Sequence, residues 1–228
     1  MGKSIVTVAV DGPAGSGKST VGRLLARALA YVYLDTGALY RAVALKVGRA
    51  GLDDSDRPGI AALCGETDVA LVERDGVTRI LLDGRDVTEL IRTPEISMLA
   101  STVSAVPEVR QRLLAVQRGA ARAGGIVAEG RDMGTVVFPG ADVKFFLTAG
   151  PEERGRRRWL ELRERGHAVE IEDVIREVVR RDRQDSEREI APLRPAEDGF
   201  LVDSTGKTVE EVVDEMLRVI KGKENGVL

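Results

Sequence analysis

The sequence contains one histidine, one asparagine and one cysteine: His167, Asn225 and Cys64. With a single cysteine, an intrachain disulfide and a cysteine metal cluster are both excluded. With a single histidine, a multi-histidine metal site is excluded as well. The lone asparagine excludes the Asn-Lys-x-Asp motif by which GTP-binding switches recognise guanine. An Asp-x-x-Gly match at Asp203–Gly206 lies near the C-terminal end, far from where a switch loop would follow a phosphate-binding loop.

Aromatic residues and long apolar runs are also scarce. Aromatics make up 4% of the chain and the net charge is −3, which disfavours a nucleic-acid-binding role. No stretch approaches the roughly 18 apolar residues of a membrane span. The first apolar run, Ile5–Val10, is short and interrupted by Thr7, which is not typical of a signal peptide. We therefore expect a cytoplasmic enzyme with no nucleic-acid or membrane partner.

A phosphate-binding loop is the strongest motif present. Residues Gly12–Ser19 match G-x-x-x-x-G-K-[ST], between an apolar run and a helical pattern that begins near Lys18. Its glycines let backbone N–H groups face an anion, and the helix N-terminus adds partial positive charge. Lys18 can reach the β- and γ-phosphates and the Ser19 hydroxyl can ligate Mg²⁺. The alternative is a glycine-rich turn that binds nothing. The predicted ATP-binding residues here are Gly12, Pro13, Ala14, Gly15, Ser16, Gly17, Lys18, Ser19 and Thr20.

Apolar runs that alternate with helical patterns predict an α/β fold with a parallel sheet. Between them, the segment Thr67–Val87 contains two strand patterns, the turn pairs Asp75-Gly76 and Asp83-Gly84, and a short third segment, Arg85–Val87. It predicts a small inserted antiparallel sheet. The expected strands are Ser4–Val10, Val32–Leu34, Ile126–Ala128, Val143–Leu147 and Phe200–Val202, and the expected helices are Lys18–Ala30, Gly37–Ala50, Pro94–Ser104, Pro107–Ala123, Pro151–Arg165, Glu172–Glu187 and Thr208–Lys221.

Two further polar blocks follow predicted strands. In an open parallel sheet, ligands bind beyond the carboxyl ends of the strands. In the block Asp35–Arg41, Thr36 offers a hydroxyl and Arg41 a guanidinium for a second phosphate. The alternative is that Thr36 caps a helix and Arg41 is merely solvated.

The block Glu129–Thr135 follows the predicted strand Ile126–Ala128. Glu129 can orient Mg²⁺-bound water, and Arg131 can neutralise phosphoryl charge. Asp132 can accept a hydrogen bond from an exocyclic amino group. The alternative is an internal Arg–Asp ion pair in a tight loop.

Arginines are dense in two neighbouring helical patterns. Phosphoryl transfer needs cations around the equatorial oxygens, and a mobile arginine-rich flap would supply them. The alternative is a solvated helix face with Glu152, Glu153, Glu161 and Glu164 as partners. The arginines are Arg154, Arg156, Arg157, Arg158, Arg163 and Arg165 in the first pattern and Arg176, Arg180, Arg181, Arg183 and Arg188 in the second.

Together these blocks resemble the bacterial cytidylate kinases, of the nucleoside monophosphate kinase family. The resemblance spans roughly Ile5 to Ile220, and the inserted sheet resembles their extended monophosphate-binding domain. The motifs that carry it are Asp11–Thr20, Asp35–Arg41, Ile91–Thr93, Gly130–Pro139 and Ala191–Leu193.

The resemblance implies a P-loop NTPase three-layer fold with a five-stranded parallel sheet, an inserted antiparallel sheet and a helical arginine-rich lid. We expect a core nucleotide-binding domain formed by residues 1–36, 102–150 and 186–228. Residues 37–101 would form the monophosphate-binding domain, with the insertion at about residues 65–92. Residues 151–185 would form the lid.

The resemblance also implies transfer of the ATP γ-phosphoryl group to CMP or dCMP with Mg²⁺, in a monomer. The alternative is another small-molecule P-loop kinase, acting on UMP, AMP or a shikimate-like acceptor. Ser101, Arg110 and Asp132 would recognise cytosine, and Arg181 and Asp185 the ribose. Thr36, Arg41, Arg131 and Arg188 would hold the acceptor phosphate, and Arg154 and Arg157 would contact ATP. The predicted catalytic residues are Lys18, Arg131, Arg188 and Arg158, and the predicted metal ligands are Ser19 and Glu129.

Overall fold

The computed structural model describes residues 6–74, 77–121 and 124–224. Its contacts divide the chain into two compact units: residues 1–33 with 124–228 form unit 1, and residues 34–123 form unit 2. Each unit has its own hydrophobic core. The predicted lid, residues 151–185, falls within unit 1. The three-part functional division remains a prediction.

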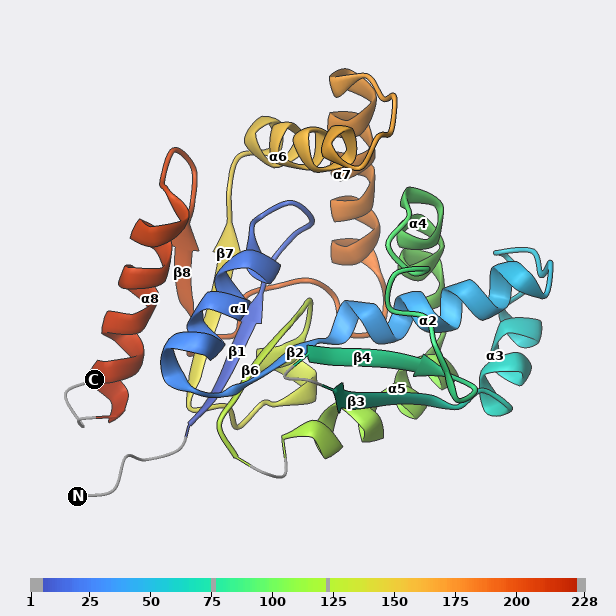
Figure 1. Ribbon diagram of the computed structural model, residues 1–228, viewed down its shortest axis with the longest axis horizontal. Helices are drawn as coiled ribbons and strands as arrows, with labels where there is room; N and C mark the ends of the chain where they lie inside the picture. Colours follow the sequence, from blue (N-terminus) through green and yellow to red (C-terminus); the bar gives the residue numbers. More distant parts are fainter. Residues whose placement is uncertain (1–5, 75–76, 122–123, 225–228) are drawn as a thin grey trace. The chain divides into compact units, whose positions relative to one another are not determined.

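The main sheet has five strands in the order β2-β6-β1-β7-β8 (Figure 1). The pairs β1–β6, β1–β7 and β7–β8 are parallel, as the alternating pattern predicts. Val10 lies in register with Glu129, and Asp11 with Gly130. The phosphate-binding loop and the Glu129–Thr135 block therefore leave the sheet at the same edge. The strands are β1 (Thr7–Asp11), β2 (Val32–Asp35), β6 (Ile126–Gly130), β7 (Val143–Thr148) and β8 (Phe200–Asp203).

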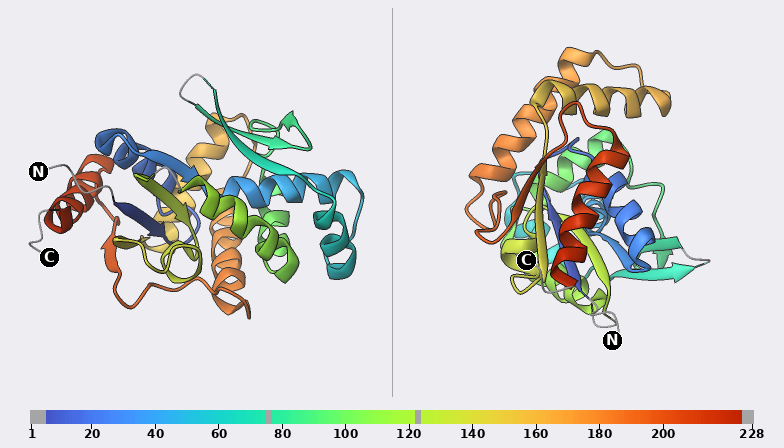
Figure 2. Two further views of the ribbon diagram at one scale, coloured as in Figure 1. Left: turned by 90° about the horizontal axis from the view of Figure 1, so that it is seen from below. Right: turned by 90° about the vertical axis from the view of Figure 1, so that its left-hand side faces the viewer.

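Helices α1 (Lys18–Leu29) and α8 (Val209–Glu224) contact each other and pack on this sheet (Figure 2). Their apolar stripes meet the inward side chains of the strands in one cluster. Leu25, Phe145 and Met216 are almost completely buried in it. Burial of each such side chain stabilises the fold by about 1.5–3 kcal/mol.

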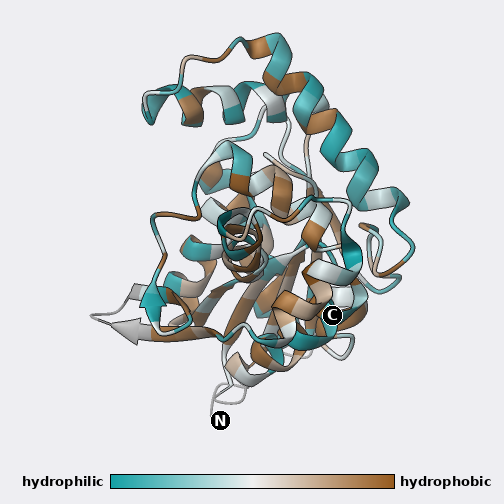
Figure 3. Ribbon diagram, turned by 90° about the vertical axis from the view of Figure 1, so that its right-hand side faces the viewer, coloured by the Kyte–Doolittle hydropathy of each residue, from teal (hydrophilic) through white to brown (hydrophobic). Residues whose placement is uncertain are grey.

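Helices α6 (Pro151–Glu164) and α7 (Ile171–Glu187) form a helical hairpin. Leu162, Val174 and Val178 are buried, while most of the other residues of both helices are charged, as the colouring in Figure 3 shows. Gly155 allows a close approach, since a Cβ there would lie 2.4 Å from the Ile175 side chain. The two helices therefore pack on a narrow apolar seam that leaves their arginines at the surface or toward the phosphate-binding loop.

Unit 2 joins a helical cluster to a small antiparallel sheet of order β3-β4-β5. The predicted turn Asp75-Gly76 lies outside the described residues. Leu39, Ile60, Ile80 and Leu113 meet in the core of this unit. Its elements are α2 (Thr36–Arg49), α3 (Arg57–Gly65), β3 (Val69–Arg74), β4 (Val77–Leu82), β5 (Arg85–Asp86), α4 (Pro94–Val103) and α5 (Pro107–Ala120).

The structure confirms the predicted α/β class, the five-stranded parallel sheet and the inserted antiparallel sheet. Two elements were not predicted: α3, and a π-helical turn at Met133–Val137 (η1). The alternative in which Thr36 caps the helix is wrong, because the Asp35 side chain accepts from Ala38 N and Thr36 is the first helical residue. Among the described residues, no helix has the length and apolar sequence needed to cross a membrane.

Candidate active site

The phosphate-binding loop connects β1 to α1 and depends on its glycines. Gly15 has a φ of +73°, and a Cβ there would lie 2.7 Å from the Arg154 carbonyl oxygen. Gly12 is equally constrained, since its Cβ would lie 2.0 Å from the Leu147 carbonyl oxygen. A side chain at either position would push the loop away from β7 or α6. The loop backbone is thus held at a closeness that only glycine permits.

Lys18 lies at the start of α1 with its ammonium group turned back into the loop. Its Nζ donates to the Pro13 carbonyl oxygen at 2.6 Å and to Ser16 Oγ at 3.3 Å. Burial, and after it the nearby Arg131 guanidinium, lower the pKa of Lys18 to about 7, although Glu129 opposes the shift. A phosphate group in the loop would supply the missing negative charge and favour the ammonium form.

Asp11 joins the end of β1 to the turn after β6. Its two carboxylate oxygens accept from the backbone N–H groups of Met133 at 2.7 Å and Gly134 at 2.8 Å. The side chain is buried, and that burial raises the pKa of Asp11 to about 6 despite these bonds. Asp11 therefore fixes the start of η1, and with it the segment that carries Arg131 and Asp132.

Glu129 is the carboxylate that the sequence predicts as a metal ligand in unit 1. It is buried at the end of β6, where it accepts a hydrogen bond from the Tyr33 hydroxyl. Ser19, in the first turn of α1, offers a partly exposed hydroxyl. Among the described residues, no three His, Cys, Asp or Glu side chains gather into a metal-holding group. Two oxygen donors with no protein cage suit Mg²⁺, which prefers oxygen and keeps ligand places for water and substrate phosphates.

Arg131 is held by an aspartate from helix α7. Its Nε donates to Asp185 Oδ2 at 2.8 Å, and its Nη1 donates to the Gly130 carbonyl oxygen at 3.3 Å. Burial alone would raise the pKa of Asp185, but Arg131 and then Arg181 hold it below its usual value. The Arg–Asp pair considered within the tight loop thus forms instead between the loop and α7.

Asp132 lies beside Arg188 at the end of α7. The distance between Asp132 Oδ1 and Arg188 Nη2 is 3.8 Å, and both side chains are buried. Arg188 Nε also donates to the Ala191 carbonyl oxygen at 2.6 Å. Unit 1 therefore gathers two arginine–aspartate pairs, Arg131–Asp185 and Arg188–Asp132, on the segments that follow β6 and α7.

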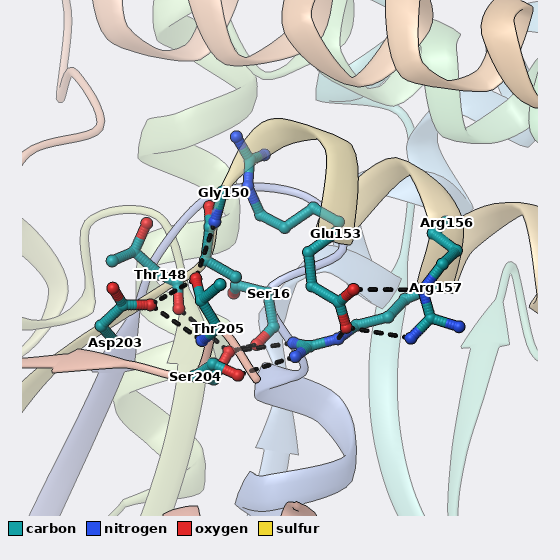
Figure 4. A network of polar contacts seen from close by, with 11 residues as sticks. Ser16, Thr148, Gly150, Glu153, Arg156, Arg157, Asp203, Ser204 and Thr205 are labelled. Atoms are coloured by element: carbon teal, nitrogen blue, oxygen red, sulfur yellow. Dashed lines mark hydrogen bonds and ion pairs between the residues drawn. The ribbon is translucent and has the colours of Figure 1, made fainter. Parts of the chain in front are cut away.

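The predicted ATP-binding and catalytic arginines of α6 form two groups, according to whether they contact residues at the phosphate-binding loop. Arg154 donates to the Ala14 carbonyl oxygen at 3.0 Å and pairs with Asp182 of α7 at 2.5 Å. Arg157 donates to Ser204, next to the phosphate-binding loop (Figure 4). Arg158 instead pairs with Glu161 one turn along its own helix, at 2.7 Å. Arg158 thus has one of the glutamate partners of the solvated-face alternative, although its side chain is only 19% exposed, while Arg154 and Arg157 turn toward the loop.

In unit 2, Asp35 organises the start of α2. It caps the helix and also pairs with Arg41, Nη2 to Oδ2, at 2.8 Å. Burial would raise the pKa of Asp35, but the Arg41 guanidinium holds it below its usual value. Thr36 is buried beside this pair. The predicted phosphate-binding arginine is thus oriented by its neighbour six residues earlier.

Arg110 and Ser101 are connected through Ser104. Arg110 Nη1 donates to the Ser104 carbonyl oxygen at 3.2 Å, and Ser104 Oγ donates to the Ser101 carbonyl oxygen at 2.8 Å. The Arg110 guanidinium also lies over the Tyr40 ring, 5.6 Å from its centroid. All of these side chains are buried. Unit 2 therefore holds a buried arginine and a buried serine on two consecutive helices, α5 and α4.

Comparison with known proteins decides the family. The cytidylate kinase family model matches residues 8–222. The chain belongs to the cytidylate kinase family. It is 51% identical to a cytidylate kinase of Geobacter sulfurreducens over 98% of this chain and 96% of the relative. It is 53% identical to a cytidylate kinase of Carboxydothermus hydrogenoformans over 97% of this chain and 99% of the relative. A gluconokinase structure from Sinorhizobium meliloti 1021 shares the fold, with a TM-score of 0.50, 16% identity, and coverage of 98% of this chain and 97% of that one.

Three residues that the sequence did not indicate hold predicted site residues in place. Tyr33 holds Glu129, Asp182 holds Arg154, and Ser204 holds Arg157. Asp35 and Tyr40 stand inside the Asp35–Arg41 block, so that motif carried a signal for them. Tyr33, Asp182 and Ser204 had none, because each is distant in sequence from its partner.

Proposed function

We propose that this chain transfers the γ-phosphoryl group of ATP to CMP or dCMP, forming ADP and CDP or dCDP. Membership of the cytidylate kinase family supports the reaction. The main structural support for this reaction is the buried Lys18 in the phosphate-binding loop. Lys18 lies near enough to Arg131 for the two charges to affect each other. A transferred phosphoryl group needs this concentration of positive charge.

The transfer proceeds in line, without a covalent enzyme intermediate. An oxygen of the acceptor phosphate bonds to the γ-phosphorus as the bond to the β,γ-bridging oxygen breaks, and ADP leaves with that electron pair. The acceptor phosphate is already anionic, so no general base is required. Lys18, Arg131, Arg188 and Arg158 neutralise the charge. Ser19 and Glu129 would hold Mg²⁺, which supplies further charge neutralisation at the β- and γ-phosphates.

The acceptor-binding residues are assigned by the resemblance to the family, and their chemistry agrees with it. Asp132 accepts from the cytosine amino group, Ser101 adds a second acceptor, and Arg110 donates to O2 or N3. Thr36 and Arg41 bind the acceptor phosphate together with Arg131 and Arg188. The ribose is assigned to Arg181 and Asp185. Uracil would place a carbonyl where the amino group belongs and leave the Asp132 carboxylate unmatched.

A coupled ADP-release assay across CMP, dCMP, UMP, AMP and shikimate tests this function. We expect turnover with CMP and dCMP to exceed that with each other acceptor by about 100-fold or more in kcat/KM. A dominant response to any other acceptor would overturn the proposal. We further propose that the enzyme works as a monomer in the cytoplasm. Sedimentation at micromolar concentration tests the monomer.

A further inference from the structure

The segment Asp203–Thr205 begins at the last residue of β8 and is not used by the proposed reaction, yet it is hydrogen-bonded to Ser16, Gly150 and Arg157 around the phosphate-binding loop (Figure 4). Ser204 lies at its centre and is 3% exposed. It comes almost 190 residues after the phosphate-binding loop, and its hydroxyl lies 3.3 Å from the Ser16 carbonyl oxygen.

Ser204 binds the Arg157 guanidinium with two of its atoms. Arg157 Nη1 donates to Ser204 Oγ at 2.9 Å, and Nη2 donates to the Ser204 carbonyl oxygen at 2.8 Å. Arg157 Nε donates to Glu153 Oε1, also at 2.9 Å. These three bonds lie along the edges of a planar group, so they fix its orientation as well as its position. An arginine has five N–H donors, and two therefore remain for oxygens of a bound nucleotide.

The Arg157 guanidinium is held beside the phosphate-binding loop. Its Nη1 lies 3.9 Å from where a Cβ on Gly17 would stand. Gly17 is the N-cap of α1, at the end of the loop where backbone N–H groups and the helix dipole favour an anion. The charge of Arg157 therefore adds to the field of the donor site.

Ser204 is itself rigidly placed. Its N–H donates to the Thr148 carbonyl oxygen at 2.8 Å. Its hydroxyl lies 3.0 Å from the same oxygen, which is closer than the Ser16 carbonyl oxygen at 3.3 Å. Next to it, Thr205 Oγ1 accepts from Gly150 N at 3.0 Å and donates to Asp203 Oδ1 at 2.7 Å. The loop is thus bound to the segment that leads into α6, the helix on which Arg157 stands.

The neighbouring Arg156 supplies a natural contrast. It pairs with the same Glu153 at 3.1 Å, but its side chain is 53% exposed, against 25% for Arg157. Ser204 is not among its hydrogen-bond partners. Two adjacent arginines thus share one carboxylate, and only Arg157 is held on the loop by Ser204.

We propose that Ser204 is a positioning residue of the donor site, which acts by holding the Arg157 guanidinium beside Gly17 before ATP binds. The inference rests on the proposed function only in taking ATP as the donor. Since the arginine is already ordered, ATP binding avoids the cost of immobilising a long side chain. Loss of the serine hydroxyl should therefore weaken the binding of ATP, because Arg157 is no longer held in place. It should leave the binding of CMP unchanged.

A double-mutant cycle tests the coupling. ATP dissociation constants are measured by calorimetry without CMP for wild type, Ser204→Ala, Arg157→Ala and the double variant. We expect Ser204→Ala to raise the ATP dissociation constant about fivefold, which is the effect of one hydrogen bond of ordinary strength. In the Arg157→Ala background the same change should alter ATP binding less than about twofold. Ser204→Thr, which keeps the hydroxyl, should restore wild-type affinity to within about twofold.

Matched controls separate this role from a structural one. Arg156→Ala should leave ATP affinity within about twofold of wild type, and the KM for CMP should stay within about twofold in Ser204→Ala. If Ser204→Ala does not fold, Arg157→Lys replaces it, because an ammonium keeps the charge but cannot bind two Ser204 atoms in the same plane. An equal effect of Ser204→Ala in both backgrounds, or an equal loss of ATP and CMP affinity, would overturn the proposal. Absence of CDP production in wild type would instead refute the proposed function, since this cycle measures ATP alone.

Discussion

Arg131 and Asp185 form an ion pair of 2.8 Å between residues 54 positions apart, with the Asp185 side chain only 5% exposed. The pair connects the segment after β6 to helix α7. It brings together two side chains that we assign to the acceptor, one to its phosphate and one to its ribose. Both are therefore held in place before a substrate arrives.

This pair predicts a pH-dependent contribution to stability. The pKa of folded Asp185 lies below its usual value of 3.8, so its stabilising effect is complete above that value and is lost as the pH falls through the lower folded pKa. Urea unfolding of wild type and Asp185→Asn between about pH 7 and pH 3 should show a difference that shrinks in acid. Asp173→Asn is the control, since Asp173 lies on the same helix in an exposed pair with Arg176. A difference that is constant with pH would show that Asp185 is not ionised in the pair.

The raised pKa of Asp11 predicts the opposite dependence of stability on pH. Burial raises its folded pKa to about 6, so its contribution to the free energy of unfolding falls as the pH rises from 3.8 through about 6. Asp11→Asn would remove this dependence and leave one backbone N–H of the η1 turn without its acceptor. We expect a loss of about 1–3 kcal/mol in urea unfolding at acidic pH. Asp142→Asn, at an exposed carboxylate that accepts from Thr7 N, should cost less. Equal losses in both variants would contradict a special role for Asp11.

Lys18→Ala should reduce kcat by about 100-fold or more with the fold intact. The variant removes an ammonium group that donates to the Pro13 carbonyl oxygen and to Ser16 Oγ in the phosphate-binding loop. Steady-state kinetics with ATP and CMP, together with a thermal melt, check this. Lys207→Ala is the control, because Lys207 is an exposed lysine paired with Glu215. Turnover near the wild-type rate in Lys18→Ala would remove Lys18 from the mechanism.

Asp132→Asn should reduce the discrimination between CMP and UMP. An asparagine amide can donate to the uracil carbonyl, which a carboxylate cannot. We expect the ratio of kcat/KM for CMP over UMP to fall from about 100 or more to about 10 or less. Each ratio is measured on one preparation, so differences in active fraction cancel. An unchanged ratio would show that another group recognises the cytosine amino function.

Much of the fold follows from local sequence. The strands β1, β6 and β7 are β-rich apolar runs, and α5 begins at Pro107 as the sequence predicts. Helix α3 was missed although Asp56 caps it and Pro58 lies in its first turn, because it has only nine residues and two of them are glycine. The η1 turn has no local signal, since Asp11, more than 120 residues earlier, holds it.

The candidate site likewise has a part that the sequence predicts and a part that only the folded chain shows. The phosphate-binding loop and the acidic strand ends were predictable, because each is a contiguous motif whose chemistry depends on residues next to one another. The partners that orient them were not predictable. Ser204 is 47 positions from Arg157, and Tyr33 is 96 positions from Glu129, so only the folded chain brings these pairs together.

The most direct test of the central claim follows the γ-phosphoryl group itself. ATP labelled with ³²P at the γ position is incubated with the enzyme, Mg²⁺ and CMP, and the products are separated by chromatography. We predict label in the β-phosphate of CDP, at a rate that matches ADP formation and depends on CMP. Label released only as inorganic phosphate, or ADP formed equally well without CMP, would contradict the account.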